Sequence, residues 1–144
     1  MAEPRFTYHT NILGTVAGVG GGIPSLASTA TSVQSAKVPC LGAKAVHFIL
    51  SADADPSAPP TLGTIGTYYQ QRGLRRTTTA NLALDANWPA ADISEGSALR
   101  VMAASGGANN IGNAIAATEM DVTIVNNGAA AMTNVRLDAL VVYG

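Results

Sequence analysis

The clearest alternation of hydrophobic and polar positions lies at the C-terminal end of the chain, in residues 119–144. Met120, Val122 and Ile124 occupy every second position of a first run, and a second run alternates in the same way over residues 135–143. Successive side chains of a β-strand point to opposite faces, so each run predicts a strand with one buried row. The intervening Asn126-Asn127-Gly128 tolerates positive φ, which favours a hairpin with a long loop.

The second of these runs is apolar on both faces near its end, because Leu140 and Val142 fall on the otherwise polar side. A strand of this kind is typical of a central position in a sheet, or of a sheet covered by a neighbouring subunit.

Similar patterns predict further short strands over residues 44–52, 64–70, 81–88 and 99–103. The segments between them are rich in turn-forming residues, and no stretch keeps a helical period, although residues 61–63 and 111–118 could each hold one helical turn. Residues 71–76 and 94–96 are predicted as turns. The predicted fold class is therefore all-β, a small antiparallel β-sandwich with the jelly roll as a candidate topology.

The N-terminal segment has a different character. Residues 6–13 alternate and suit either a first strand or an arm that pairs with a sheet edge, whereas residues 14–36 are mainly Gly, Ser, Thr and Ala without a lasting period. We predict an extended low-complexity arm over residues 1–36 and a β-sandwich domain over residues 37–144 that folds without it. The arm would anchor on another chain through its large apolar side chains, Phe6, Tyr8, Ile12 and Leu13.

Composition narrows the range of partners. The chain has 144 residues, only 12% of them charged, and a net charge of −1. Sequence-independent nucleic-acid binding needs a basic surface, and no apolar run reaches membrane-spanning length, so neither nucleic acid nor membrane is an expected partner. Glu3 and the glycines after residue 13 disfavour a signal peptide, which predicts synthesis in the cytoplasm. A surface so poor in charge indicates burial in an assembly.

Two motifs suggest phosphate or metal binding, but each lacks residues that such a site requires. The cluster Gly18–Gly22 has Ile23 where a dinucleotide loop needs its third glycine, and no lysine follows until Lys37. Asp53 and Asp55 could share a divalent cation, but no further carboxylate lies near them in the sequence to complete its coordination. We expect no metal site and no cofactor.

The remaining candidates for chemistry are a thiol and a basic cluster. Cys40 would need His9 or His47 as its base, and its setting between Pro39 and Leu41 indicates packing, so no enzyme is predicted. The densest basic cluster, close after two tyrosines, could hold single-stranded nucleic acid, but in a net acidic chain it favours a subunit or partner contact. Its members are Arg72, Arg75 and Arg76.

Together, the charge-poor sandwich, the N-terminal MAEPRFTYHTNILGTVAG and the C-terminal VRLDALVVYG resemble a decoration (cement) protein of a tailed bacteriophage head. This resemblance implies a structural protein on the capsid surface of the virion. It further implies a homo-oligomer, dimer or trimer, that binds the major capsid protein and ties neighbouring coat subunits together.

A shorter stretch, VTIVNNGAAAMTNVRLDA, is similar to the hairpin of immunoglobulin-like repeats in bacterial surface proteins, although the chain has neither a repeat nor a secretion signal. The alternative function is therefore a receptor- or carbohydrate-binding β-sandwich module of a virion or bacterial surface. Such a module would use loops such as residues 106–118.

Overall fold

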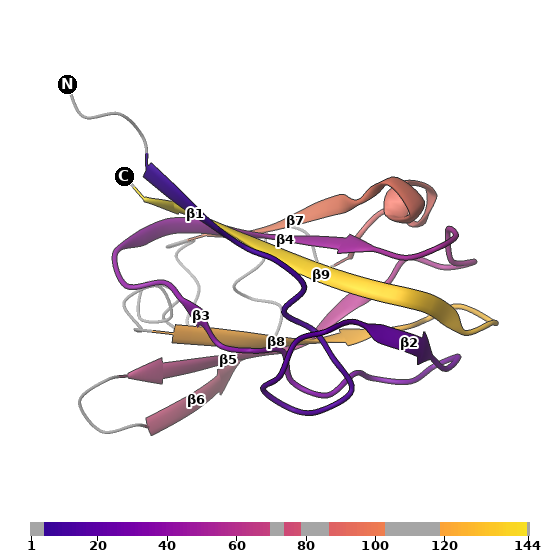
Figure 1. The fold of residues 1–144 in the computed structure, drawn as a ribbon, viewed down its shortest axis with the longest axis horizontal. Helices are drawn as coiled ribbons and strands as arrows, with labels where there is room; N and C mark the ends of the chain where they lie inside the picture. Colours follow the sequence, from indigo (N-terminus) through magenta and orange to yellow (C-terminus); the bar gives the residue numbers. More distant parts are fainter. Residues whose placement is uncertain (1–4, 70–73, 79–86, 103–118, 144) are drawn as a thin grey trace.

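The computed structural model of the protein describes residues 5–69, 74–78, 87–102 and 119–143. Two antiparallel sheets face each other across a hydrophobic core (Figure 1). The first sheet contains, in order, β1 (Arg5–His9), β9 (Met132–Tyr143), β4 (Ala43–Ser51) and β7 (Ser97–Met102), with β2 (Ile23–Leu26) also paired to β9. The second contains β3 (Val38–Pro39), β8 (Glu119–Val125), β5 (Thr61–Tyr69) and β6 (Leu74–Thr78). The all-β sandwich prediction is confirmed.

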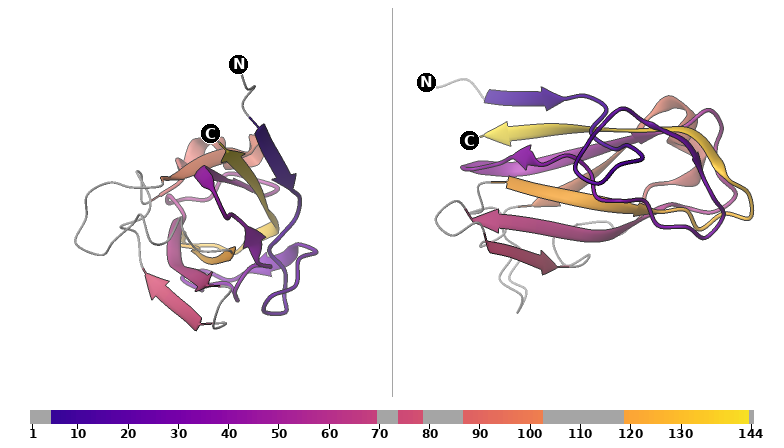
Figure 2. Two further views of the ribbon diagram at one scale, coloured as in Figure 1. Left: turned by 90° about the vertical axis from the view of Figure 1, so that its left-hand side faces the viewer. Right: turned by 60° about the horizontal axis from the view of Figure 1, so that its bottom comes forward.

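The strand pairing identifies the topology as a jelly roll. β1 pairs with β9, β3 with β8, β4 with β7 and β5 with β6, so the first half of the chain pairs with the second half in reverse order. Further pairing of β4 with β9 and of β5 with β8 rolls this nested ribbon into two sheets (Figure 2). Apart from the additional β2, this is the arrangement of two four-stranded antiparallel sheets, connected in this way, that defines the jelly roll.

The predicted C-terminal hairpin is wrong, although both of its strands are present. β8 lies in the second sheet and β9 in the first, so residues 126–131 carry the chain from one sheet to the other. Alternation specifies a strand and its buried face but not its neighbour, and here each strand is paired on both sides with strands distant in sequence. The central position predicted for residues 135–143 is confirmed, since β9 lies between β1 and β4.

The core is formed by the inward-facing rows of both sheets. In β4 this row consists of Val46, Phe48 and Leu50, all without solvent exposure. Trp88 lies just before the 3-10 helix η2 (Ala90–Glu95), and its Nε1 donates a 3.0 Å hydrogen bond to the carbonyl oxygen of Phe48. A buried indole whose N–H is satisfied in this way contributes its apolar area at no polar cost.

The N-terminal segment packs on its own chain. β1 pairs with residues 139–143 of β9 and β2 with residues 132–135, and the amide of Ile12 donates to the carbonyl of Leu137 at 2.7 Å. Residues 5–26 thus form one edge strand with a loop inserted at residues 13–22. Leu13 is completely buried and Ile12 nearly so, in the same core as Val38.

This packing corrects two expectations for the segment. The predicted boundary between residues 36 and 37 does not divide an arm from a domain, because both parts pack in one core. Ile12 and Leu13 are buried in that core and are not available to another chain. A chain beginning at residue 37 would lose Ile12, Leu13, Ile23 and Leu26 from the core. The expectation that such a chain folds unaided is therefore replaced by an expectation of substantial destabilisation.

The glycines of the inserted loop serve close approach and special backbone geometry. A Cβ on Gly20 would overlap the carbonyl oxygen of Asn11, and one on Gly14 would lie 2.6 Å from the carbonyl oxygen of Gly20. Gly21 and Gly22 have φ of 118° and 90°, values that other residues rarely adopt. The glycine cluster, which was predicted to be part of a flexible arm, is therefore required by the geometry of a tight loop.

Serine side chains pin the next segment to the edge of β8. The hydroxyls of Ser35 and Ser32 accept the amides of Val122 and Ile124 at 3.0 and 2.9 Å. The two serine amides donate in turn to the carbonyls of the same residues, at 2.9 and 2.8 Å. These hydrogen bonds order residues 30–36 without large apolar side chains and cover part of a sheet edge.

Three shorter predictions also need correction. Residues 61–63 belong to β5 and not to a helical turn, and Arg75 and Arg76, predicted in a turn, lie in β6. Residues 94–96 close the 3-10 helix η2, which the sequence pattern did not predict. The possible helical turn at 111–118 lies outside the described residues.

A candidate protein-binding surface at the β1 edge

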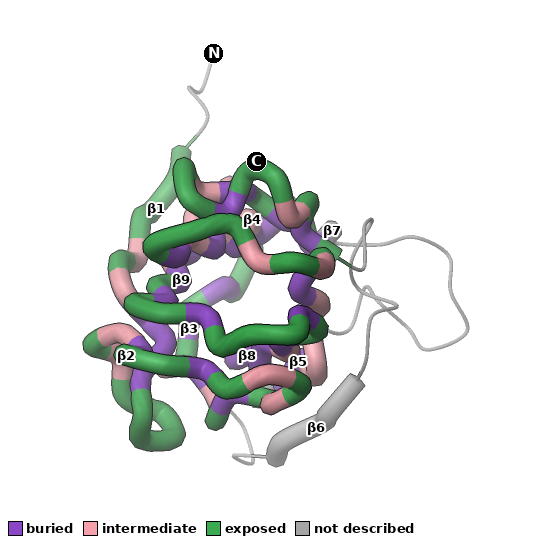
Figure 3. The backbone as a smooth tube through the Cα atoms, turned by 90° about the vertical axis from the view of Figure 1, so that its right-hand side faces the viewer, coloured by how far each residue is buried: buried purple, intermediate pink, exposed green. Residues whose placement is uncertain are grey.

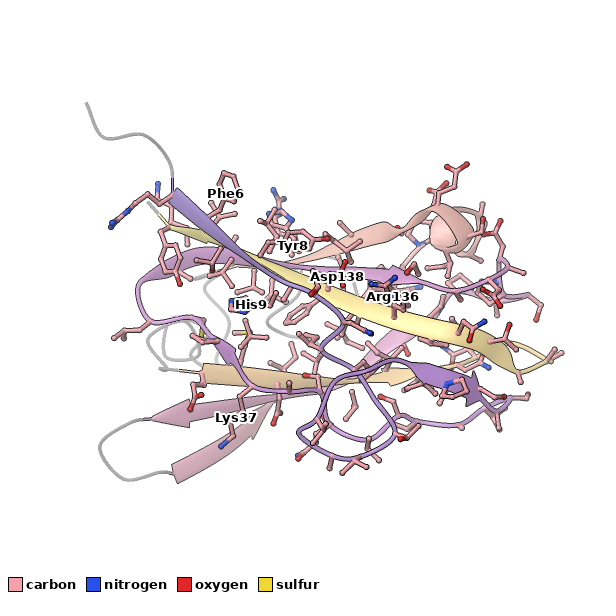
Figure 4. All side chains as sticks on the ribbon, viewed as in Figure 1. Phe6, Tyr8, His9, Lys37, Arg136 and Asp138 are labelled. Carbon is pink, nitrogen blue, oxygen red and sulfur yellow. The ribbon has the colours of Figure 1, made fainter. Side chains whose placement is uncertain are left out.

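β1 differs from the other strands of its sheet in being exposed on both faces. Four of its five residues are exposed, and only His9 is partly buried (Figure 3). Phe6 is 66% and Tyr8 50% accessible to solvent, and both lie on the face of β1 that points away from the second sheet (Figure 4). Large aromatic side chains in such a position are typical of protein-binding surfaces.

Tyr8 is held in place by Asp138. The hydroxyl of Tyr8 donates a 2.8 Å hydrogen bond to Oδ2 of Asp138, while Oδ1 of the same carboxylate accepts the amide of Asn11 at 2.7 Å. The hydrogen bond to Asp138, followed by burial and by the carboxylate's charge, raises the pKa of Tyr8 above its ordinary value. A side chain already fixed in one orientation loses less entropy when a partner covers it.

Aliphatic side chains of the neighbouring strands continue this aromatic surface. Phe6 lies opposite Val142 and Tyr8 opposite Leu140 in the β1–β9 register. Ile49 of β4 lies opposite Asp138, one step further along the same face. We call these five residues the outer-face patch: Phe6, Tyr8, Ile49, Leu140 and Val142. The last three are each partly buried, whereas the rings of Phe6 and Tyr8 are exposed.

Cationic side chains border the patch. Arg136 of β9 and Arg100 of β7 are exposed on the same outer face, where Arg100 lies opposite His47. Burial, together with the charge of Arg100, lowers the pKa of His47, so the imidazole is neutral at pH 7. An apolar centre with a charged, solvent-accessible border is the usual arrangement of a protein interface.

A shallow hollow adjoins the patch at the first residue of β1. It has a volume of about 500 Å³ and is lined by Arg5, Phe6, Thr7 and Tyr143. Thr7 and Phe6 contribute to it from the strand itself, so a partner that pairs with β1 would also cover this hollow.

The structure separates the residues predicted to contact partners. Phe6 and Tyr8 lie in the outer-face patch, whereas Ile12 and Leu13 are in the core. Arg72 lies outside the described residues. Arg75 and Arg76 pair with Tyr68 and Thr67 at the edge of the second sheet, so they lie in a different sheet from the patch. Their partner-binding role stays a prediction, as does that of residues 106–118, which also lie outside the described ranges.

Sequence reasoning missed Asp138, which holds Tyr8 in place, and it also missed Ile49 of the patch and the bordering Arg100 and Arg136. The available signal for Asp138 was its position, an acidic residue on the outer face of the strand between Arg136 and the apolar Leu140. Leu140 and Val142 themselves were recognised as unusual, and the structure places them in the patch.

The predicted pair Asp53 and Asp55 tie a loop to two different elements. Oδ2 of Asp53 accepts hydrogen bonds from Asn134 at 2.6 Å and Thr133 at 3.4 Å, and Oδ1 of Asp55 accepts the amide of Ser94 at 2.8 Å. Within the described ranges, no group of three or more metal-ligating side chains comes together.

Cys40 is completely buried, and burial, with a smaller contribution from Glu119, raises its pKa to about 12. Only the thiolate reacts, so at pH 8 iodoacetamide should label the folded protein at least about 100-fold more slowly than the unfolded protein. Because the folded protein therefore binds the thiol proton more tightly than the unfolded protein, the free energy of unfolding should fall as the pH rises from about 9 towards 12.

Mass spectrometry of timed samples measures the labelling rate, with Cys40→Ser as the unlabelled control. Rapid labelling of the folded protein would show a reactive thiol and contradict a packing role.

Comparison with known proteins gives one likeness. No protein-family model matches the chain, and no curated protein matches it. The crystal structure of SPBc2 prophage-derived protein YomS is similar over 99% of this chain and 96% of its own, with 10% sequence identity and a TM-score of 0.39. Within the described residues, no helix has the length and apolar character of a membrane span.

Proposed function

We propose that this protein is a structural decoration protein of a phage particle, which binds the outside of the assembled head and stabilises it by bridging coat subunits. The observation that supports this role best is the outer-face patch, an apolar surface centred on two exposed aromatic rings. The exposed rings of Phe6 and Tyr8 contribute little to the stability of a free monomer. When a partner covers them they can contribute much of the binding energy, because buried aromatic residues dominate many interfaces.

The proposed role depends on many copies of one contact, repeated over the surface of the shell. Each outer-face patch supplies one modest contact, with Tyr8 already ordered by Asp138. An icosahedral shell presents the same acceptor surface many times, and linked copies convert later binding events into intramolecular ones. The low charge of the chain suits this role, because few charged groups need to be desolvated when its surface is covered.

In this proposal the major capsid protein is the partner, and the protein is located on the capsid surface of the virion without a catalytic role or a cofactor. The outer face of the β1-β9-β4-β7 sheet is the side that meets the shell. The opposite face of that sheet is buried in the core and is not available.

The proposed function is tested by purifying particles from cells that carry this gene and quantifying their proteins by mass spectrometry. We expect the chain to band with the particles at a copy number comparable to that of the coat protein, and to be removed by treatments that leave the shell intact. Its absence from purified particles, or its presence at only a few copies, would contradict a decoration role.

A further inference from the structure

We infer that two copies of this protein join through antiparallel pairing of β1 with β1. This inference rests on the proposed function and names the first partner of the β1 edge, a second copy of the same chain. One edge of β1 pairs with β9, and among the residues that the structure describes no strand pairs with its other edge. An unpaired edge offers a row of backbone donors and acceptors to any strand of matching register.

The sequence of β1 is self-complementary about its central residue. A two-fold axis through Thr7 places Phe6 of one copy opposite Tyr8 of the second copy, and Tyr8 opposite Phe6. Both aromatic residues lie on the outer face, and opposite residues of an antiparallel pair share a face, so the rings would form two cross-strand aromatic pairs. The interface would be isologous and closed, as in most homodimers.

The charges and composition of β1 permit this contact. The strand contains neither proline nor lysine, the residues that commonly protect sheet edges, whereas the edge strand β3 of the second sheet contains Pro39. Arg5 is the one formal charge of β1. In the symmetric register the two Arg5 side chains would start about 13 Å apart along the strands. This separation exceeds the Debye length of about 8 Å at physiological ionic strength, so their repulsion would be largely screened.

The expected affinity follows from the size of the contact. Two five-residue strands with two aromatic pairs bury less than the roughly 1,200 Å² of a stable interface, so the free dimer should be weak. On a shell, β1–β1 pairing would join the first sheets of the two copies into one continuous sheet. Both outer-face patches would lie on the same face of that sheet, with the two Phe6–Tyr8 pairs at its centre. A particle that binds both copies would then strengthen the dimer through effective concentration.

The test is a disulfide at the proposed two-fold axis. In the Thr7→Cys variant the two new thiols would be directly opposite each other, with Cα atoms about 4.5–5.5 Å apart, within the range that a disulfide spans. The matched control is Thr10→Cys, also an exposed threonine, whose two copies would be about 20 Å apart in the same register. Cys40 can remain, because it is buried.

Under mild oxidation, we expect at least about tenfold more disulfide-linked dimer from Thr7→Cys than from Thr10→Cys, in concentrated free protein and on particles. Phe6→Ala in the Thr7→Cys background should reduce this yield. Equal cross-linking of the two cysteine variants would overturn the inference. So would a particle-bound Thr7→Cys protein whose thiol is protected from alkylation but not cross-linked, because that result indicates pairing with a coat-protein strand.

The two proposals can fail separately. A Thr7 cross-link in a protein that is absent from particles would leave the dimer standing and remove the decoration role. Abundant particle-bound protein without the Thr7 cross-link would remove the dimer and leave the decoration role.

Discussion

Replacing Asn126 with alanine should destabilise the protein by about 3 kcal/mol or more, because it removes several buried hydrogen bonds and leaves carbonyl groups without partners. The side chain of Asn126 is completely buried where the chain passes from one sheet to the other. Its Nδ2 donates to the carbonyls of Leu26 and Ala130 at 3.0 Å each, and its Oδ1 accepts the amide of Gly128 at 2.9 Å. One side chain therefore joins β2 to the connection between β8 and β9.

The adjacent Asn127 provides a matched control. It is exposed, and its Nδ2 donates to the carbonyl of Pro59 at 3.0 Å on the surface. Asn127→Ala should cost less than about 1 kcal/mol, since water can replace the lost partner. Urea denaturation followed by the fluorescence of Trp88 measures both variants, and a shared m-value shows that only stability has changed. Similar midpoints for the two variants would contradict the structural role assigned to Asn126.

Replacing both Phe6 and Tyr8 with alanine should weaken binding to undecorated particles by at least about 30-fold, because we expect each of these aromatic anchors to contribute about 1 kcal/mol or more. The stability of the free protein should change little, since Phe6 is mostly exposed and Tyr8 loses one surface hydrogen bond. Cosedimentation of the protein with particles at increasing concentration measures the change.

The matched control for this prediction is Leu41→Ala. Leu41 is 62% exposed, close to the value for Phe6, but it lies in the turn before β4 and outside the outer-face patch. Its replacement removes a similar exposed apolar side chain and should leave binding unchanged. Equal losses for the two variants would show that general hydrophobicity, and not the patch, controls binding.

Period-two alternation was sufficient to predict the core strands. Val46, Phe48 and Leu50 on β4, and the inward row of β9, have the burial that their alternation indicates. Alternation also identified the unusual outward residues Leu140 and Val142, which became part of the candidate site. Both successes concern which face of a strand is apolar, and this is a local property of the sequence.

The wrong predictions concern which segments of the chain pair or pack with each other. The hairpin prediction for β8 and β9 failed because adjacent alternating strands can pair or can cross between sheets, and alternation does not distinguish the two. Asn126 makes its buried hydrogen bonds at this crossing. The N-terminal segment was predicted to leave the domain because it has too few large apolar residues to form a core of its own. Backbone pairing, the serine hydroxyls and four buried aliphatic residues hold it in place, and hydrogen bonds of this kind have no hydrophobic signature.

The candidate site was predicted only in part for the same reason. Phe6 and Tyr8 are prominent in a polar segment, so the sequence identified them, but it could not separate them from Ile12 and Leu13 a few residues later. The separation arises where the edge strand passes from the end of the sandwich, where β1 is exposed on both faces, to its middle, where the core covers it.

Hydrogen–deuterium exchange of the free and particle-bound protein tests most directly whether the β1 edge is the binding surface. Exchange in the free protein should be faster in residues 5–9 than in the interior strands β4 and β9, because β1 is exposed on both faces. On particles, we expect strong protection of residues 5–9 and little change in the loop at residues 53–60. Protection of that loop with unchanged exchange in β1 would contradict the account.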